Sequence, residues 1–195
     1  VHIGHARGAV LGSTLANVLK AAGYQVVREY YINDAGNQID AFARSLEARY
    51  RQALGQPAEL PADGYQGSYL VDLAQEVVRE QGDAFLRRPE EESRRRLGEL
   101  GVQKMLRAIQ EDLERIRVGF DVWFSERSLY EEGHYQKVMD LLREGGYLAH
   151  REGAVWFVSS ALAPEAPDKD TVLVRSNGLP TYFASDAAYH YHKFL

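Results

Sequence analysis

The sequence predicts an α/β fold in which helices pack on a parallel sheet, and two observations carry this prediction. Apolar residues recur at helical spacing over residues 11–22 and again over residues 39–50. A β-branched and aromatic stretch at residues 25–32 lies between them and reads as a strand. Because only a few residues connect these segments, the order helix–strand–helix favours a parallel sheet covered by helices.

Glycine and short polar residues mark the expected ends of these elements. Gly23 is expected to end the first helix, since glycine suits the left-handed position just after a helix. Asn33 and Asp34 are expected to cap the second helix. A loop rich in glycine and proline follows. Further helices are expected over residues 69–80, 101–117 and 134–144, and a short strand over residues 120–124.

Residues 87–96 hold a dense run of arginine and glutamate. Such a run is typical of a solvated helix start, and the alternative is an edge that contacts RNA.

The last part of the chain predicts two β-hairpins. The first pairs residues 147–150 with residues 154–158 around Glu152-Gly153. The second turns at Asn177-Gly178. Its two strands are residues 173–175 and 181–183. Ser185 or Asp186 is then expected to cap a final helix.

Composition excludes several classes of protein. The 195 residues include no cysteine, which excludes disulfides and cysteine-ligated zinc. Apolar residues make up 45% and charged residues 26%, as in an ordinary globular protein. No apolar run reaches the length of a membrane span. The net charge of −5 does not indicate a general affinity for nucleic acid. We therefore expect a cytoplasmic protein that binds neither a membrane nor DNA, and the oligomeric state stays open.

The residues with the clearest chemistry are His2, Gly4 and His5, at the expected start of a helix. A helix N-terminus offers free N–H groups and a positive dipole end, which suits phosphate. Gly4 lets a nucleotide lie against the backbone. Both histidines can donate hydrogen bonds to phosphate oxygens, on which charge builds in a phosphoryl-transfer transition state. These residues therefore predict an ATP site, although a plain helix start is an equally good interpretation of four residues. A zinc site is a weaker alternative, because no third ligand lies nearby in the sequence.

Three stretches of the chain resemble one known family. Residues 2–5 are similar to the HIGH signature of class I aminoacyl-tRNA synthetases, and residues 5–12 resemble the version found in arginyl-tRNA synthetases. Residues 30–39 and 173–190 also look like that family, in the same order and at similar spacing. The resemblance covers essentially the whole chain and is least distinctive over residues 55–118.

The resemblance implies a fold, a reaction and a set of roles. The fold would be a partial Rossmann-like (HUP-type) nucleotide-binding domain of a class I synthetase, with an inserted α+β connective segment. The reaction would activate L-arginine with ATP and Mg²⁺ and transfer it to tRNA(Arg), with no protein-bound metal. His2 and His5 match the catalytic histidines that bind ATP, together with Gly4, and Tyr182 and Asp186 match positions that hold arginine.

The residues themselves agree with these roles without requiring them. Asp186 can face a guanidinium, and Tyr182 offers a ring face and a hydroxyl. The plainer interpretations are a helix cap for Asp186 and a half-buried strand aromatic for Tyr182. Asn33, Asp34 and Gln38 follow a strand that should end near the pocket, so they are possible lining residues.

The resemblance also predicts a division of the chain. Residues 1–54 would form the first part of the catalytic domain, residues 55–170 the insertion, and residues 171–195 the return to the catalytic domain. A strand and an arginine-binding asparagine are expected before His2, and a lysine-rich KMSKS-type loop is expected beyond Leu195. We therefore expect these 195 residues to be inactive alone.

Two other functions stay open at this point. One is a different enzyme with an HxGH motif, such as a nucleotidylyltransferase or another class I synthetase. The other is a synthetase-like module that binds without catalysis.

Overall fold

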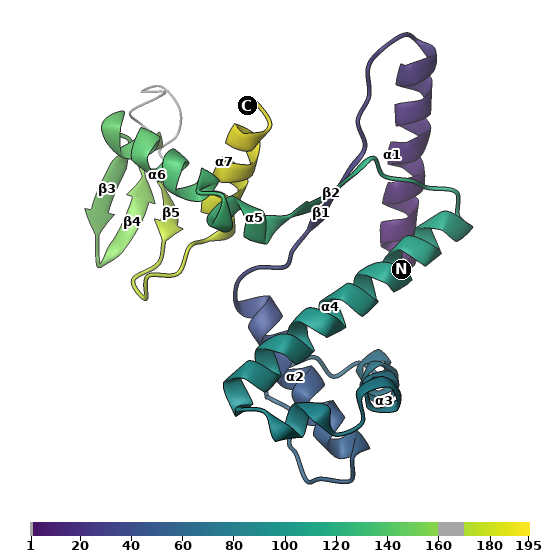
Figure 1. The fold of residues 1–195 in the computed structure, drawn as a ribbon. Helices are drawn as coiled ribbons and strands as arrows, with labels where there is room; N and C mark the ends of the chain where they lie inside the picture. Colours follow the sequence, from purple (N-terminus) through teal and green to yellow (C-terminus); the bar gives the residue numbers. More distant parts are fainter. Residues whose placement is uncertain (1, 160–169) are drawn as a thin grey trace. The chain divides into compact units, whose positions relative to one another are not determined.

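The structure, a computed structural model, describes residues 2–159 and 170–195 and divides into two compact units. The first unit holds Val1–Tyr30 and Asp34–Trp123, and the second holds Tyr31–Asn33 and Phe124–Leu195. Helices and two small sheets alternate along the chain, which confirms the α/β class (Figure 1). The predicted domain boundaries stay predictions, and residues 160–169 of the predicted insertion lie outside the described residues.

Helix α1 (Ile3–Ala21) opens the first unit. It begins well before residue 11, where the apolar periodicity that predicted this helix starts. Gly23 follows its end in the left-handed conformation, with φ of 91°. The Gly23 N–H donates to the Lys20 carbonyl at 3.1 Å, and the Tyr24 N–H donates to the Leu19 carbonyl at 3.0 Å. These two bonds form a Schellman motif, so the predicted role of Gly23 is confirmed.

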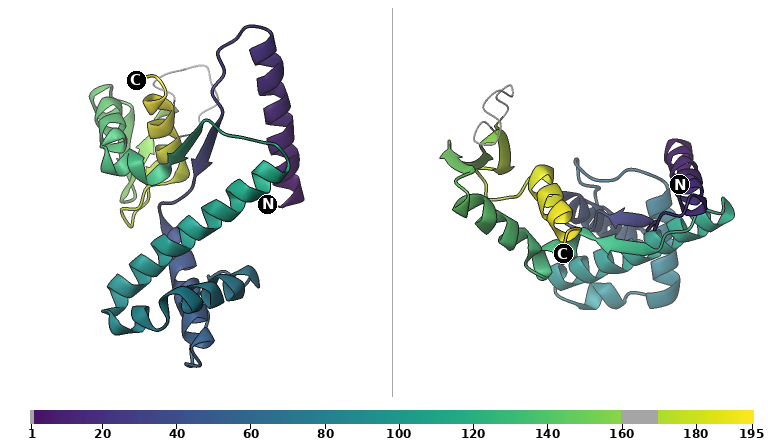
Figure 2. Two further views of the ribbon diagram at one scale, coloured as in Figure 1. Left: turned by 45° about the vertical axis from the view of Figure 1, so that its right-hand side comes forward. Right: turned by 90° about the horizontal axis from the view of Figure 1, so that it is seen from above.

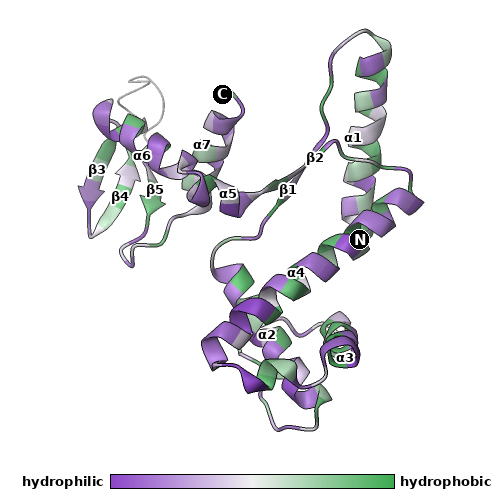
Figure 3. Ribbon diagram, viewed as in Figure 1, coloured by the Kyte–Doolittle hydropathy of each residue, from purple (hydrophilic) through white to green (hydrophobic). Residues whose placement is uncertain are grey.

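The apolar face of α1, formed by Leu11, Leu15 and Val18, is largely exposed among the described residues. Leu11, Leu15 and Val18 are 62%, 58% and 60% exposed, and Ala16 alone is buried in this helix. Apolar residues recur along α1 in Figure 3. The apolar periodicity therefore predicted the helix correctly, but the apolar face that it would normally bury is exposed here. Within the described residues, none of the helices has the length and apolar character that a bilayer span needs.

Three further helices form the core of the first unit. Helix α2 (Asn37–Ala53) packs against both α3 (Tyr69–Gln81) and α4 (Glu90–Arg115), as Figures 1 and 2 show. A short 3-10 helix, η1 (Ala84–Arg87), leads into α4. The apolar faces predicted for residues 39–50 and 69–80 meet here. The buried core consists of Phe42, Leu46, Tyr50, Leu70, Leu73, Ala74, Val77, Phe85 and Leu97.

The start of α2 differs from the prediction. Gly36, not Asn33 or Asp34, occupies the N-cap position, and its φ of 78° lies in the region that glycine adopts most easily. The Gly36 carbonyl accepts the first helical bond, from the Ile39 N–H at 3.1 Å. A turn at glycine therefore replaces the side-chain cap that the sequence suggested.

Helix α4 is one continuous helix rather than a charged start followed by a separate helix. Its arginines pair with glutamates one turn away, as in Arg95–Glu99 at 2.9 Å and Arg96–Glu92 at 2.9 Å. These are the solvated i,i+4 pairs expected of such a run.

Two glycines bring α4 close to α2. A Cβ at Gly98 would lie 2.7 Å from the Ala43 Cβ, and a Cβ at Gly101 would lie 2.5 Å from the Leu46 Cδ2. Both glycines are buried. The helices can therefore approach to this separation only because these positions have no side chain.

Lys104 links α4 to α3. Its ammonium lies 2.5 Å from a Glu76 oxygen and 2.7 Å from a Glu80 oxygen, and its side chain is 11% exposed. The hydrogen bonds that Lys104 donates to these carboxylates, with Glu76 the larger contributor, raise the pKa of Lys104. The bond that Glu76 accepts from Lys104 lowers the pKa of Glu76.

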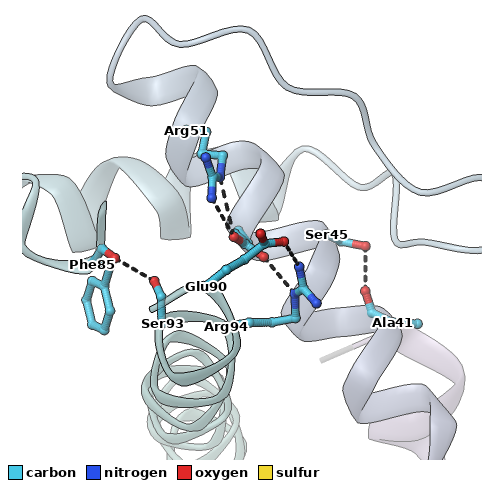
Figure 4. A network of polar contacts seen from close by, with 8 residues as sticks. Ala41, Ser45, Arg51, Phe85, Glu90, Ser93 and Arg94 are labelled. Carbon is cyan, nitrogen blue, oxygen red and sulfur yellow. Dashed lines mark hydrogen bonds and ion pairs between the residues drawn. The ribbon is translucent and has the colours of Figure 1, made fainter. Parts of the chain in front are cut away.

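A buried carboxylate connects α2 to the start of α4. Glu47 is 6% exposed; one of its oxygens accepts a bond from Arg51 at 3.0 Å, and the other accepts one from Arg94 at 2.7 Å. Arg94 also donates to Glu90 at 2.6 Å. Figure 4 shows Arg51 and Arg94 approaching from the two helices. Glu47 thus has both oxygens satisfied by charged partners, which a buried carboxylate requires.

Strands β1 (Glu29–Ile32) and β2 (Val122–Ser125) pair as a two-stranded sheet. Within the first unit, the Tyr30 ring stacks on Trp123 with centroids 4.6 Å apart. Within the second unit, the Tyr31 ring stacks on Phe124 at 5.9 Å. Both predicted strands are confirmed, although β1 is shorter than residues 25–32.

The second unit contains a three-stranded antiparallel sheet with helices. Strands β3 (Leu148–Arg151) and β4 (Ala154–Phe157) form the first predicted hairpin, with positive φ at Glu152 and Gly153. Strand β5 (Thr171–Val174) pairs with β4. Helix α6 (His134–Glu144) was predicted, whereas the short helix α5 (Glu126–Glu131) was not.

The second predicted hairpin is wrong, because α7 (Tyr182–His192) begins where its second strand was expected. The chain does turn at Gly178, but only an isolated bridge joins Val174 to Pro180. Thr181 then fixes the helix start: its N–H donates to the Leu173 carbonyl at 2.8 Å, and its hydroxyl donates to the Val172 carbonyl at 2.6 Å. Neither Ser185 nor Asp186 caps the helix.

We predict that Gly98→Ala destabilises the first unit by about 1–3 kcal/mol, because the added methyl group overlaps the Ala43 Cβ in a packed interface. Faster hydrogen exchange of α2 and α4 amides in the full-length protein would measure this loss. Gly12→Ala is the matched control, since a Cβ at Gly12 meets nothing within 4 Å and alanine favours a helix. Equal exchange in both variants would contradict the close approach.

We also predict that Glu47→Ala costs about 2–4 kcal/mol, because it leaves two arginines without their shared carboxylate. Urea unfolding of the full-length protein, followed by exchange at α2 and α4, measures the change. Glu99→Ala removes an exposed partner of Arg95 and should cost less than about 1 kcal/mol. Losses of similar size would show that Glu47 acts as an ordinary surface charge.

Candidate functional site

The first candidate site is the N-terminus of α1, where His2 occupies the N-cap position. The Gly4 N–H donates to the His2 Nδ1 at 3.1 Å. An Nδ1 that accepts this bond carries a lone pair, so the proton of a neutral His2 ring lies on Nε2. His2 therefore satisfies one free N–H of the helix and keeps a donor available on its other nitrogen.

His5 lies one turn along the same helix. The His2 and His5 rings are 5.8 Å apart and meet edge to face at 66°. Both side chains are exposed, and the first turn of α1 contains no acidic residue. Two imidazoles and the free N–H groups thus gather at the positive end of the helix dipole, an arrangement that can bind an anion.

Gly4 has a geometric role in this cap. A Cβ at Gly4 would lie 3.3 Å from the His2 Nδ1, so a side chain there would press on the capping ring. Further along α1, Gly8 and Gly12 line a cavity of about 340 Å³ together with residues 26–29 and 118–120. The described residues therefore leave open space beside α1 within the first unit.

The second candidate site is one face of α7, in the second unit. Tyr182 and Asp186 lie four residues apart in this helix, so their side chains share a face. Tyr182 is 56% exposed and Asp186 is exposed, whereas Ser185 and Ala188 are buried. The plainer interpretations are therefore wrong: Tyr182 is not a strand residue, and Asp186 is not the helix cap. An exposed ring and an exposed carboxylate side by side can hold a planar cation.

Aromatic and hydroxyl contacts hold α7 in place. The Tyr130 hydroxyl lies 2.8 Å from the Ser185 Oγ. The Tyr189 ring contacts Phe124 at 4.9 Å and Tyr31 at 4.8 Å between centroids. The buried side of α7 is thereby anchored to α5, β1 and β2 within the second unit.

The second unit also holds a buried carboxylate that the sequence did not single out. Glu126, the first residue of α5, is 5% exposed. Burial, followed by the negative charges of Glu126 and Asp186, raises the pKa of Tyr31. Tyr31 therefore stays protonated at neutral pH. The available signal in the sequence was the position of Glu126 directly after a strand. Helix α5, which Glu126 begins, is only six residues long and was not predicted.

The remaining predicted residues are divided between the units. Asn33 is exposed at the end of β1 and belongs to the second unit with Tyr182 and Asp186. Asp34 and Gln38 belong to the first unit with the two histidines. Their role as pocket-lining residues stays a prediction. Among residues 2–159 and 170–195, no group of three histidine, aspartate or glutamate side chains has the arrangement of a metal site.

Comparison with known proteins gives matches along nearly the whole chain. Residues 1–194 match the family model for class I tRNA synthetases (R), catalytic domain. The chain is 57% identical over 195 residues to an arginine–tRNA ligase of Dehalococcoides mccartyi, and 51% identical over 194 residues to that of Carboxydothermus hydrogenoformans. All of this chain is covered in both cases, and it spans 34% of each relative.

Solved structures show the same similarity in three dimensions. An arginyl-tRNA synthetase chain from Campylobacter jejuni superposes with a TM-score of 0.84 at 37% identity, covering 100% of this chain and 42% of that one. The arginyl-tRNA synthetase of Thermus thermophilus gives 0.66 at 26% identity, covering 98% and 33%. Because the family model matches nearly the whole of this chain, the chain belongs to the class I tRNA synthetase (R) catalytic-domain family.

Proposed function

We propose that this chain is the part of an arginine–tRNA ligase that binds ATP and arginine. The observation that carries the proposal is the pair of exposed side chains on α7, Tyr182 and Asp186, in a chain whose family model matches along residues 1–194. The names of the similar proteins support the choice of arginine. Because the chain spans about a third of those relatives, the activity belongs to the full-length protein.

The first half-reaction needs positioning and charge rather than a protein nucleophile. An oxygen of the arginine carboxylate attacks the α-phosphorus of ATP, the new P–O bond forms, and the bond to pyrophosphate breaks. His2, through Nε2, and His5 would donate to the α-phosphate oxygens as charge develops on them. Mg²⁺ would accompany the ATP phosphates as part of the substrate.

Arginine recognition would rest on the exposed face of α7. A carboxylate such as Asp186 can accept two hydrogen bonds from a guanidinium, and the Tyr182 ring offers it a flat face. The 3′-terminal hydroxyl of tRNA(Arg) would then attack the carbonyl carbon of the adenylate, and AMP would leave. With a net charge of −5, the chain would contact tRNA through a local surface. We place this reaction in the cytoplasm.

We predict that Asp186→Ala raises the KM for arginine in ATP–pyrophosphate exchange by the full-length protein. Loss of a paired charge should cost about 2–5 kcal/mol of binding. Asp140→Ala is the matched control, because it removes an exposed carboxylate of the same unit that pairs with Arg143. An unchanged KM for arginine in Asp186→Ala would refute the assignment of this face.

The two roles of His2 can be separated by substitution. His2→Asn keeps a side-chain acceptor for the Gly4 N–H but loses the ring donor. We expect kcat for exchange to fall about 100-fold or more in both His2→Asn and His2→Ala. Only His2→Ala should also destabilise α1, by about 1 kcal/mol. Full activity in His2→Asn would mean that His2 serves only as a cap.

A further inference from the structure

A pair of hydroxyl groups ties α7 to α5 directly beside the proposed arginine face. The Tyr130 hydroxyl and the Ser185 Oγ are 2.8 Å apart, and both residues belong to the second unit. Ser185 is 4% exposed and immediately precedes Asp186 in α7. The hydrogen bond therefore acts on the turn of the helix that carries the Asp186 carboxylate.

The Tyr130 side chain is itself held by its neighbours. Its ring packs against a buried core that includes Leu129 and Val138. It also lies 5.0 Å from the Tyr135 ring of α6, measured between centroids. Burial raises the pKa of Tyr130, so its hydroxyl is protonated at neutral pH. Tyr130 thus presents a neutral hydroxyl to α7 from a fixed position.

The hydrogen bond restricts the rotation of α7 about its own axis. The buried residues of α7 are Ala184, Ser185 and Ala188, and of these Ser185 alone is polar. Packing of alanine methyl groups is non-directional, so it tolerates a small rotation of the helix. A hydrogen bond weakens as its distance and angle leave a narrow range. The Tyr130–Ser185 pair is therefore a directional constraint on this turn of α7.

A small rotation of α7 would be enough to displace the Asp186 carboxylate. Ser185 and Asp186 are neighbours in one helix, about 100° apart around its axis, and turn together. A side-chain tip lies about 5–6 Å from the axis, so a rotation of about 10° moves it by about 1 Å. Misplacement of that size can cost about 100-fold in activity. Half of such a rotation would still be felt by a bound guanidinium.

We propose that Tyr130 and Ser185 are positioning residues for arginine binding. Their hydrogen bond sets the rotation of α7, and hence the direction in which Asp186 presents its carboxylate to the guanidinium. Ser185 is buried, and neither hydroxyl needs to contact arginine. The inference rests on the proposed function, because it assigns a support to the arginine site proposed above.

Tyr130→Phe and Ser185→Ala, each in the full-length protein, remove one hydroxyl and leave the other without its partner. We expect the KM for arginine in ATP–pyrophosphate exchange to rise about tenfold in both variants. The KM for ATP and kcat should stay within about twofold, because the guanidinium lies at the far end of arginine from the reacting carboxylate. Hydrogen exchange of the α7 amides should become faster, since an unpaired buried hydroxyl is destabilising.

The double variant Tyr130→Phe/Ser185→Ala separates positioning from stability. It leaves neither hydroxyl unpaired, so exchange of the α7 amides should return toward the unmodified rate. The KM for arginine should stay raised about tenfold, because the directional bond is still missing. A purely structural role of the pair predicts that the exchange rate and the arginine KM change together.

Tyr50→Phe is the matched control. It removes a tyrosine hydroxyl that donates to the Gly82 carbonyl at 2.6 Å in the first unit. It should leave the KM for arginine unchanged, because the loss of a tyrosine hydroxyl elsewhere in the chain does not touch α7.

Three results would overturn the inference. They are an unchanged arginine KM in Tyr130→Phe or Ser185→Ala, a parallel rise of the arginine and ATP KM values, and a double variant in which α7 exchange and the arginine KM change together. Asp186→Ala, measured beside these variants, separates this inference from the proposed function. If Asp186→Ala weakens arginine binding and Tyr130→Phe does not, only the positioning role fails. If Asp186→Ala has no effect, the arginine site itself is wrongly placed.

Discussion

The bonds that Thr181 makes to β5 fix where α7 begins, and hence which side chains this helix exposes. Its N–H and hydroxyl hold the chain against the carbonyls of Leu173 and Val172, and helical geometry begins at the next residue. From that start, the spacing of the helix places Tyr182 and Asp186 on one exposed face, while Ser185 and Ala188 are buried. A start one residue later would rotate the first turn against the strand, so the exposure of Tyr182 and Asp186 depends on contacts made by the residue directly before this helix.

The two candidate sites use different physical means. At α1, the groups that could bind a ligand are backbone N–H groups and the imidazoles beside them, so the end of a helix would supply the chemistry. At α7, the side chains supply the chemistry and the helix supplies only their spacing. Phosphate, which carries charge on several oxygens, suits the first arrangement, and a planar guanidinium suits the second.

Much of the fold could be predicted because its helices carry strong local signals. The apolar periods of α2, α3 and α6 and the Glu152-Gly153 turn were sufficient. The start of α7 was not predictable in this way, because Thr181 and the aromatics after it have strand propensity, and contacts with β5 overrode it. The histidine motif and the Tyr182–Asp186 pair stood out through family resemblance. Glu126 did not, because its burial arises only in the folded chain and no sequence motif marks it.

The position of Lys104 between Glu76 and Glu80 has a consequence for chemical modification of the protein. Acylating reagents and acetyl donors react with the neutral amine of lysine, not with the ammonium. The two carboxylates raise the pKa of Lys104 and so lower the neutral fraction, and the side chain is 11% exposed. Lys104 should therefore react slowly while α3 and α4 remain packed, and a gain in its reactivity would report that these helices have separated.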